Sequence, residues 1–308
     1  MTGQRKTALV LVLAAASWGF GTILSKYALD EVPALTLLPI QLAASVLVLT
    51  ILVYRHGVPE QPNSTSPILG RLGILNPGLA YTFTLLGLAS ISASLVVLIG
   101  AIEPVMILVL ASVFLRERVT PTMVALSACA LAGTLVVVYD PTSSGQAIGI
   151  VLAITGVACC AVYTVIARRW IGTDESTLRV VAVQQAYAFG FAIVLFSLAG
   201  LLGGHVVLPS SLLGWGSAIG SGVVYYAAAY WFYLTGLRAA PAFIAAASFY
   251  LIPVFGVAGS FILLGERFDM LQWLGVVVVV GAVIALARAQ AKAAGREGAQ
   301  TVATASTA

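Results

Sequence analysis

The chain has 308 residues, of which 60% are hydrophobic and 8% are charged, and its formal net charge is +4. Soluble domains carry about 25% charged residues, so these few charges cannot cover a water-facing surface. The composition therefore excludes an ordinary soluble globular protein and predicts that most of the surface faces lipid. The three cysteines, Cys129, Cys159 and Cys160, lie inside apolar runs, where we expect them to act as small packing residues.

Ten apolar runs near the length of one bilayer crossing, about 20 residues, follow one another along the chain. The first continues to Ala28, which is too long for a cleaved signal, and we interpret it as an uncleaved helix. The breaks between runs are short and hold most of the charges. The sequence thus predicts an all-α polytopic membrane protein with ten transmembrane helices. They are expected at 7–28, 34–54, 68–88, 92–115, 121–139, 146–168, 178–202, 212–236, 239–264 and 270–288.

The lysines and arginines predict the orientation of these helices, because cytoplasmic loops carry an excess of them. With the N-terminus inside, the inner segments hold 13 of the 15, and the outer segments hold only Lys26 and Arg267. We therefore expect a multi-pass protein of the cell (inner) membrane with both termini in the cytoplasm. Residues 289–308 are rich in Ala, Thr and Ser, which predicts a disordered cytoplasmic tail.

The sequence also matches itself at an offset of 149 residues, where Gly73–Arg118 falls on Gly222–Arg267 without a gap. A weaker match, at an offset near 142, aligns Trp18 with Cys160. Each half then has five spans, and since five is odd, the second half enters the membrane in the opposite direction. The pattern predicts two inverted five-helix repeats, residues 1–142 and 143–288. Inverted repeats are a recurring plan of secondary transporters.

Three short motifs stand out: one in the first span, one within the fourth and ninth spans, and one where those two spans end. These are Trp18-Gly19, Pro104 and its counterpart Pro253, and the closing pairs Glu117-Arg118 and Glu266-Arg267. With them the chain, from about residue 7 to 288, resembles the drug/metabolite transporter superfamily, specifically EamA-type ten-helix metabolite exporters. The resemblance implies two inverted five-helix repeats, both ends cytoplasmic, and export or exchange of small metabolites such as amino acids. The first closing pair follows Arg116, where a glycine is usual.

Glu103 is the one carboxylate near the middle of a predicted span. A charged side chain at the centre of a transmembrane helix costs roughly 2.5 to 3.5 kcal/mol on insertion scales. We therefore interpret Glu103 as a group that binds the amino group of a substrate or exchanges a proton with it. The alternative is a buried, hydrogen-bonded structural acid. The repeat counterpart of Glu103 is Ile252, so any proton site here is asymmetric.

Aromatic and polar side chains within the spans provide the remaining candidates. Together they could line a cavity for an amphipathic molecule or a cation, although Tyr and Trp also form belts at membrane interfaces. The amides Gln41, Gln184 and Gln185 are expected to link helices by hydrogen bonds. The substrate-binding candidates are Glu103, Trp18, Asn76, Tyr81, Tyr163, Tyr226, Tyr230 and Ser248, and the candidate helix hinges are Pro77, Pro104 and Pro253.

These patterns predict a secondary transporter that exports or exchanges small amphipathic metabolites, such as amino acids, by alternating access around a central cavity. A proton-coupled cationic drug exporter on the same scaffold is the alternative. A polytopic membrane enzyme is a weaker third hypothesis, because the sequence has no HExxH, no paired intramembrane aspartates and no Ser/His or Cys/His arrangement. No metal or organic cofactor is implied. The expected partners are a small-molecule substrate, the lipid bilayer and protons, without nucleic acid, in a monomer or homodimer.

Overall fold

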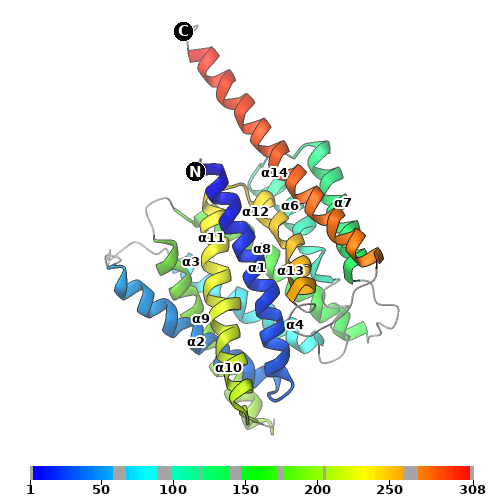
Figure 1. The fold of residues 1–308 in the computed structure, drawn as a ribbon. Coiled ribbons are helices and arrows are strands. Elements are labelled where there is room, and N and C mark those ends of the chain that lie inside the picture. Colours follow the sequence, from blue (N-terminus) through cyan, green and yellow to red (C-terminus); the bar gives the residue numbers. More distant parts are fainter. Residues whose placement is uncertain are drawn as a thin grey trace.

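The structure is a computed structural model that describes residues 3–57, 67–88, 99–117, 119–138, 147–172, 176–203, 206–259 and 270–305. All elements in these ranges are helical (Figure 1). The α-helices are α1 (Gly3–Leu29), α2 (Ala34–Arg55), α3 (Pro67–Gly73), α4 (Ala80–Leu88), α6 (Glu103–Phe114), α7 (Pro121–Val138), α8 (Ala147–Trp170), α9 (Thr177–Leu201), α10 (Leu212–Ser221), α11 (Ala229–Ala239), α12 (Ala242–Ala247), α13 (Leu251–Gly259) and α14 (Met270–Ala305). Two π-helical segments, η1 (Ile74–Leu79) and η2 (Gly222–Ala228), and a 3₁₀ turn, η3 (Ser248–Tyr250), join some of them end to end.

Within the described residues, each predicted span contains one helix or a run of helices joined end to end. Five helices are long and apolar enough to cross a membrane unbroken: α1, α2, α8, α9 and the first 20 residues of α14. The third, eighth and ninth spans are the composite helices α3–η1–α4, α10–η2–α11 and α12–η3–α13. Helix α6 is the described helix of the fourth span, and α7 is the fifth. The predicted all-α architecture of ten membrane helices in two repeats is confirmed.

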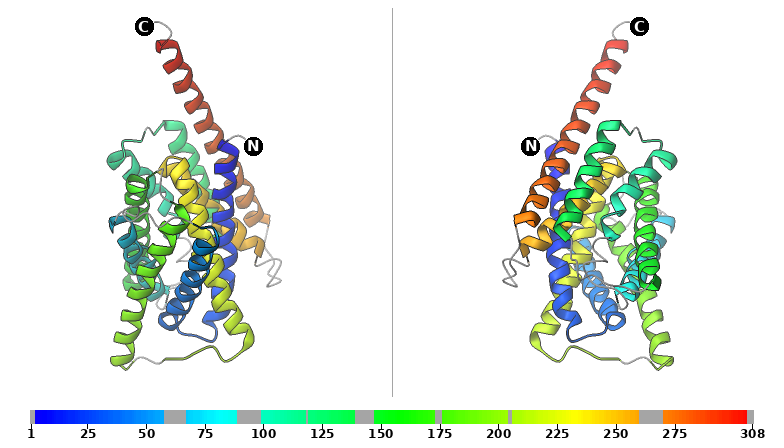
Figure 2. Two further views of the ribbon diagram at one scale, coloured as in Figure 1. Left: turned by 90° about the vertical axis from the view of Figure 1, so that its left-hand side faces the viewer. Right: turned by 90° about the vertical axis from the view of Figure 1, so that its right-hand side faces the viewer.

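Both ends of the chain lie at the same end of the bundle (Figures 1 and 2). This placement agrees with an even number of crossings. The C-terminal segment differs from the prediction, because α14 continues to Ala305 where a disordered tail was expected. Alanine supplies seven of the 17 residues from 289 to 305, and it has the highest intrinsic helix propensity.

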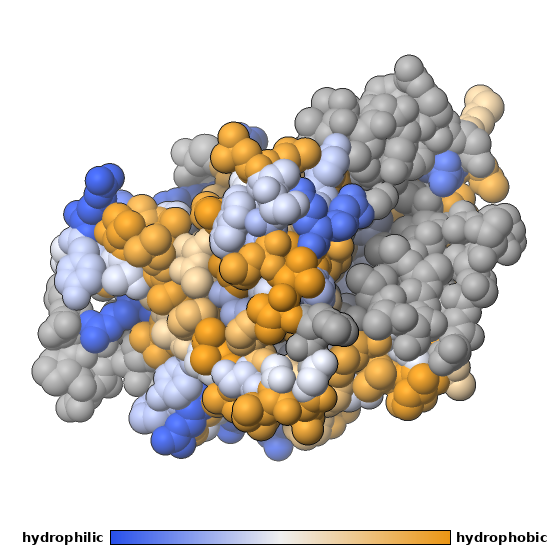
Figure 3. Space-filling model, turned by 90° about the horizontal axis from the view of Figure 1, so that it is seen from below, coloured by the Kyte–Doolittle hydropathy of each residue, from blue (hydrophilic) through white to orange (hydrophobic). Residues whose placement is uncertain are grey.

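The exterior is apolar in a way that suits lipid. Large hydrophobic side chains such as Leu47, Val113 and Val277 are exposed along the spans. Figure 3, viewed from the end away from the termini, shows apolar residues over much of the described surface with hydrophilic residues scattered among them. Exposed apolar surface on this scale marks contact with a membrane or a partner.

The two repeats interlock through equivalent helices. Helix α2 packs against its counterpart α9, and α7 packs against its counterpart α14. The third span of each repeat also packs on the second span of the other. At these contacts a Cβ on Gly73 would overlap the backbone of Gln184, and a Cβ on Gly222 would overlap the backbone of Gln41. Only glycine permits so close an approach of two backbones.

The π-helical segments occur at the same place in both repeats. Moving Ile74–Leu79 along the chain by 149 residues gives 223–228, and η2 is Gly222–Ala228. Within η1, Asn76 has non-helical dihedral angles (φ −148°, ψ 118°), and the Asn76–Pro77 peptide bond is cis. Because Pro77 has no N–H to donate, the helical hydrogen-bond ladder is interrupted there. Short π segments are frequent at functional sites.

The other two candidate hinge prolines also lie at changes of helix type. Pro104 is at the start of α6, where a proline is well tolerated, and the turn at residues 101–102 precedes it. The fourth span is therefore interrupted just before Pro104 and is not kinked at mid-helix. Pro253 is the third residue of α13, directly after the turn η3. Movement at these positions stays a prediction.

Candidate substrate-binding site

A cavity of about 110 Å³ lies at the centre of the bundle. Its walls come from spans one, three and four of the first repeat and from the equivalent spans six, eight and nine of the second. Spans two, five, seven and ten contribute none of the described lining residues. The lining consists of Trp18, Asn76, Tyr81, Glu103, Cys160, Tyr163, Thr164, Tyr225, Tyr230, Tyr233, Phe249 and Ile252.

The lining follows the internal repeat. Four pairs of equivalent positions both reach the cavity: Trp18 and Cys160 at the offset of 142, and Asn76 with Tyr225, Tyr81 with Tyr230, and Glu103 with Ile252 at the offset of 149. The cavity therefore lies where the two repeats are related by their approximate symmetry. Its chemistry is not symmetric, since a carboxylate in one repeat faces the position of an isoleucine in the other.

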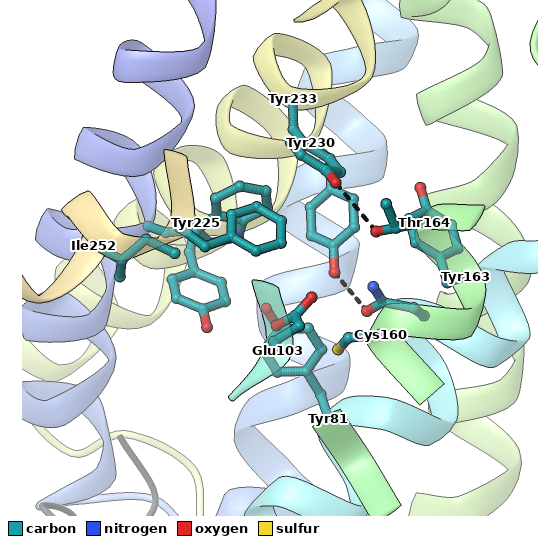
Figure 4. A pocket seen from close by; sticks show the side chains of 12 residues that line it. Tyr81, Glu103, Cys160, Tyr163, Thr164, Tyr225, Tyr230, Tyr233 and Ile252 are labelled. Atoms are coloured by element: carbon teal, nitrogen blue, oxygen red, sulfur yellow. Dashed lines mark hydrogen bonds between the residues drawn. The ribbon is translucent and has the colours of Figure 1, made fainter. Parts of the chain in front are cut away.

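Six of the eight predicted substrate-binding residues meet in this cavity, and Figure 4 shows four of them labelled: Tyr81, Glu103, Tyr163 and Tyr230. The other two predicted residues, Tyr226 and Ser248, are buried outside the lining. The Ser248 hydroxyl donates to the carbonyl of Ala245 at 2.7 Å within its own helical run. The ring of Tyr226 packs against Tyr81, with 5.5 Å between centroids.

The π-helical turn explains the displacement of Tyr226. The sequence argument placed Tyr226 and Tyr230 on one α-helical face, four residues apart. In a π-helix, residues five apart share a face, so the wider turn of η2 carries Tyr225 to the cavity in place of Tyr226.

Six lining residues were not among the predicted site residues: Cys160, Thr164, Tyr225, Tyr233, Phe249 and Ile252. The internal repeat contained the signal for three of them. Cys160, Tyr225 and Ile252 are the counterparts of Trp18, Asn76 and Glu103, and a cavity on the symmetry axis receives both members of each pair. Cys160, expected to be a packing residue, instead has its side chain in the cavity wall.

Hydrogen bonds fix several of the tyrosines. Tyr230 donates to the side-chain oxygen of Asn76 at 2.7 Å, and Tyr163 donates to that of Gln184 at 2.9 Å. The Tyr233 hydroxyl lies 3.1 Å from that of Thr164. These bonds are buried, and each joins two different spans. The rings are therefore held in place before any ligand arrives.

The helix-linking role predicted for the amides is confirmed. Gln41 donates to Ser25 at 3.0 Å and, across the repeats, to Ser221 at 2.8 Å. Gln184 donates to the carbonyl of Leu69 at 2.8 Å, and Gln185 donates to that of Tyr226 at 3.5 Å.

Trp18 is held by three aromatic neighbours and carries an unused donor. Its ring lies 5.3 to 5.6 Å, centroid to centroid, from Tyr230, Tyr233 and Phe249, in edge-on arrangements. Its indole N–H is buried without a hydrogen-bond partner in the described structure. An unsatisfied buried donor costs about 1 to 3 kcal/mol. Since Trp18 lines the cavity, a ligand with an acceptor group could remove this cost.

Glu103 is the charged residue of the lining. Figure 4 shows its carboxylate near the centre of the site, with Tyr225 on one side and Cys160 on the other. None of the twelve lining residues is a lysine or arginine, and within the described ranges no group hydrogen-bonds to Glu103. This geometry does not support the alternative of a hydrogen-bonded structural acid. A carboxylate in such a place needs a proton or a cation to neutralise it.

Two other carboxylates tie the repeats together at opposite ends of the bundle. Glu31, between α1 and α2, accepts hydrogen bonds from both hydroxyls and both backbone N–H groups of Ser210 and Ser211. Glu117, after α6, accepts from the N–H groups of Ala242 at 2.8 Å and Phe243 at 3.4 Å, where α12 begins. The first closing Glu-Arg pair of the sequence thus has a structural explanation through Glu117. The second pair lies outside the described residues.

Comparison with known proteins agrees with this architecture. A curated protein of Archaeoglobus fulgidus, described as an uncharacterized transporter, is 27% identical over 157 residues, which are 51% of this chain and 55% of that protein. The match thus spans about half the length of this relative. A solved crystal structure covers 92% of this chain and 98% of its own, with a TM-score of 0.78 and 19% identity, and it shows the shared fold alone.

The family comparison covers the chain most fully. The model of the EamA-like transporter family matches residues 5–139 and again residues 147–288, one match for each repeat. The two matches together include most of the chain, and the cavity lies between them. The chain is therefore a multi-pass membrane protein that belongs to the EamA-like transporter family.

Proposed function

We propose that this transporter carries small amphipathic amines across the membrane, with Glu103 as the group that binds their positive charge. The observation that carries the proposal is the composition of the cavity wall. One carboxylate stands among seven aromatic side chains, and the wall contains no lysine or arginine. Aromatic faces attract cations, by about 0.5 to 2 kcal/mol each, so the wall favours an ammonium group over a neutral or anionic one.

An amino acid or related compound is the second candidate, and the indole N–H of Trp18 favours it. A zwitterion brings a carboxylate that must also be neutralised or hydrogen-bonded. The buried Trp18 donor lacks a partner in the described structure and could bind that carboxylate. One neutral donor compensates a carboxylate less well than a cation does, so the amine ranks first.

The size of the cavity argues for a small substrate. Sites for drug-sized ligands usually have about 300 to 1,000 Å³, whereas this cavity has about 110 Å³. An apolar cavity of about 150 Å³ holds benzene. A large cationic drug would need a substantial widening of the site, and a small amine would need less.

Proton exchange follows from the cost of an uncompensated carboxylate within the membrane, which is several kcal/mol. In the proposed cycle Glu103 holds a proton when the site is empty. An ammonium ion binds and the proton leaves to the water on the side to which the cavity is open. After the cavity opens to the other side, the amine leaves and a proton binds. One monocation is exchanged for one proton, so the cycle moves no net charge.

Alternating access is supported by the symmetric cavity and by the two carboxylate contacts. Glu31 and Glu117 join the repeats at opposite ends, and both contacts are formed in this structure. Opening one end requires the local contact to break while the other can remain. The small central cavity is what this cycle needs between its two open states.

Exchange in proteoliposomes tests the proposal with two probes that differ by one group. Isoamylamine is leucine without its carboxylate. With an imposed pH gradient, we expect concentrative isoamylamine uptake that is faster than in protein-free liposomes, with little leucine uptake and no dependence on membrane potential. Glu103→Gln should abolish the gradient-driven uptake, and Asp30→Asn, at an exposed loop position, should not. Transport of leucine but not isoamylamine would favour the second candidate. Gradient-driven uptake in Glu103→Gln that still exceeds the rate in protein-free liposomes would overturn the role of Glu103.

A further inference from the structure

A second hollow lies on the outside of the bundle, between α2 and α9. It has a volume of about 420 Å³ and shares no lining residue with the central cavity. Its walls include Val46, Val53 and Tyr54 of α2 and Arg179, Ala182 and Val183 of α9. Small side chains, such as that of Ala182, line the α9 side of this hollow, which forms a groove at the surface.

The two helices run in opposite directions along this groove. Gln41 of α2 and Gln185 of α9 are at one level, because they bond to Ser221 and to the carbonyl of Tyr226, which are close together in α10 and η2. Tyr54 follows Gln41 along the chain, whereas Arg179 precedes Gln185. Tyr54 and Arg179 nevertheless line the same groove. The end of α2 therefore meets the beginning of α9.

The groove has the depth and polarity of one lipid leaflet. From Val46 to Tyr54 a helix rises about 12 Å, and half of the hydrocarbon core of a bilayer is about 15 Å. Its lining is mainly apolar, with Val46, Val53, Val183 and two alanines, and Thr50 adds a hydroxyl between Val46 and Tyr54. At the shallow end stand Tyr54, which is 80% exposed, and Arg179. Tyrosine and arginine are typical of the depth of lipid headgroups.

The helix dipole does not favour a positive charge at the position of Arg179. This residue lies in the first turn of α9, near the positive end of the dipole. A guanidinium has five N–H donors, so it can hold a phosphate through two of them while it makes other contacts. Arg55, exposed in the last turn of α2, adds a second positive charge to the same end. None of the described lining residues is acidic.

We propose that this groove is a binding site for one anionic phospholipid of the leaflet predicted to face the cytoplasm. An acyl chain lies along the apolar floor between α2 and α9, and the phosphate is bound by Arg179 beside Tyr54. A second copy of this chain fits less well, because a symmetric contact would bring Arg179 and Arg55 of both copies together. A zwitterionic lipid lacks the net negative charge that these two arginines complement.

Lipid titration of the purified full-length protein tests this site independently of transport. Dioleoylphosphatidylglycerol or dioleoylphosphatidylcholine would be added in mixed micelles, and binding followed by native mass spectrometry and by the apparent melting temperature. We expect the anionic lipid to bind saturably at one molecule per chain, at least about tenfold more tightly than the zwitterionic one. Equal binding of the two lipids, or a dimer in place of a lipid adduct, would overturn the proposal.

Two variants and a matched control locate the site. Arg179→Gln should remove most of the preference for the anionic lipid. Ala182→Leu should fill the groove and weaken binding of this lipid while leaving Arg179 and its other contacts in place. Arg169→Gln removes an exposed arginine at the end of α8, outside the groove, and should change nothing. Unchanged binding in Ala182→Leu, or an equal loss in Arg169→Gln, would show that the lipid does not occupy this groove.

Discussion

The hydroxyl of Tyr230 lies 2.7 Å from the side-chain oxygen of Asn76 and joins the second repeat to the first inside the central cavity. Asn76 is the residue of η1 with non-helical dihedral angles. The bond therefore connects the broken third span to the eighth span. Both partners line the cavity.

Tyr230→Phe should destabilise the protein by about 1 to 3 kcal/mol, because the buried Asn76 oxygen would lose its donor. The measurement is thermal unfolding of the purified protein in detergent. Tyr187→Phe is the matched control, since Tyr187 is exposed on α9, away from the cavity. Equal losses in the two variants would mean that the bond to Asn76 contributes nothing specific.

The symmetry of the cavity predicts that the carboxylate can be moved to the other repeat. Glu103→Ile should stop gradient-driven amine uptake, and the double variant Glu103→Ile/Ile252→Glu should restore part of it. The reason is that residues 103 and 252 are equivalent positions of the two repeats and both line one cavity. Proteoliposome uptake under a pH gradient measures both variants. Ile252→Glu alone places two acids in one site and should disturb the exchange ratio. A folded double variant without uptake would argue against equivalence of the two walls.

Acid should weaken the contact of Glu31. Hydrogen bonds from the Ser211 hydroxyl, and then from the backbone N–H groups of Ser211 and Ser210, lower the pKa of Glu31. A carboxyl with a lowered folded-state pKa contributes stability that is complete above its unfolded value, about 4.3, and that is lost as the pH falls through the folded value. Melting temperatures measured from pH 7 down to pH 3 should therefore fall more in the wild type than in Glu31→Gln. Asp30→Asn should keep the wild-type profile. The same fall in Glu31→Gln would contradict this assignment.

The close backbone contacts of the repeats predict opposite results for three glycines. Gly73→Ala and Gly222→Ala should each destabilise the protein by about 1 to 3 kcal/mol, since a Cβ would overlap the backbone of the facing helix. Gly190→Ala should be neutral or stabilising, by up to about 1 kcal/mol, because nothing lies near its Cβ position in α9. Thermal unfolding distinguishes the three variants. Similar melting temperatures for all of them would argue against the interlocked packing.

The membrane architecture could be predicted from the sequence because its causes are local. Hydropathy and chain length determine where a helix can cross a bilayer, whereas the orientation that the lysines and arginines indicate stays a prediction. The self-match at 149 residues then divides ten spans into five and five. Helix type was beyond this reasoning, because η1 and η2 lie where each third span approaches Gln184 or Gln41 of the other repeat, a contact that no local pattern reveals.

The site could be predicted in part for a similar reason. Glu103, Asn76 and Trp18 carry polar groups within predicted membrane spans, where such groups are unusual. Polar groups at such positions tend to face a cavity. The choice of Tyr226 over Tyr225 assumed α-helical spacing, which a π turn changes by one residue. Ser248 bonds to its own helical run, and a sequence does not distinguish that bond from one to a ligand.

The division of the spans has a consequence for how this protein can evolve. Six spans supply every described residue of the cavity wall, while α2, α7, α9 and α14 pair with one another and supply none. Substitutions on the cavity-facing sides of the six can retune which molecules are accepted while those four helices keep the bundle assembled. Lining positions that make no hydrogen bond between spans, such as Phe249 and Ile252, can therefore change the cargo without a loss of the fold.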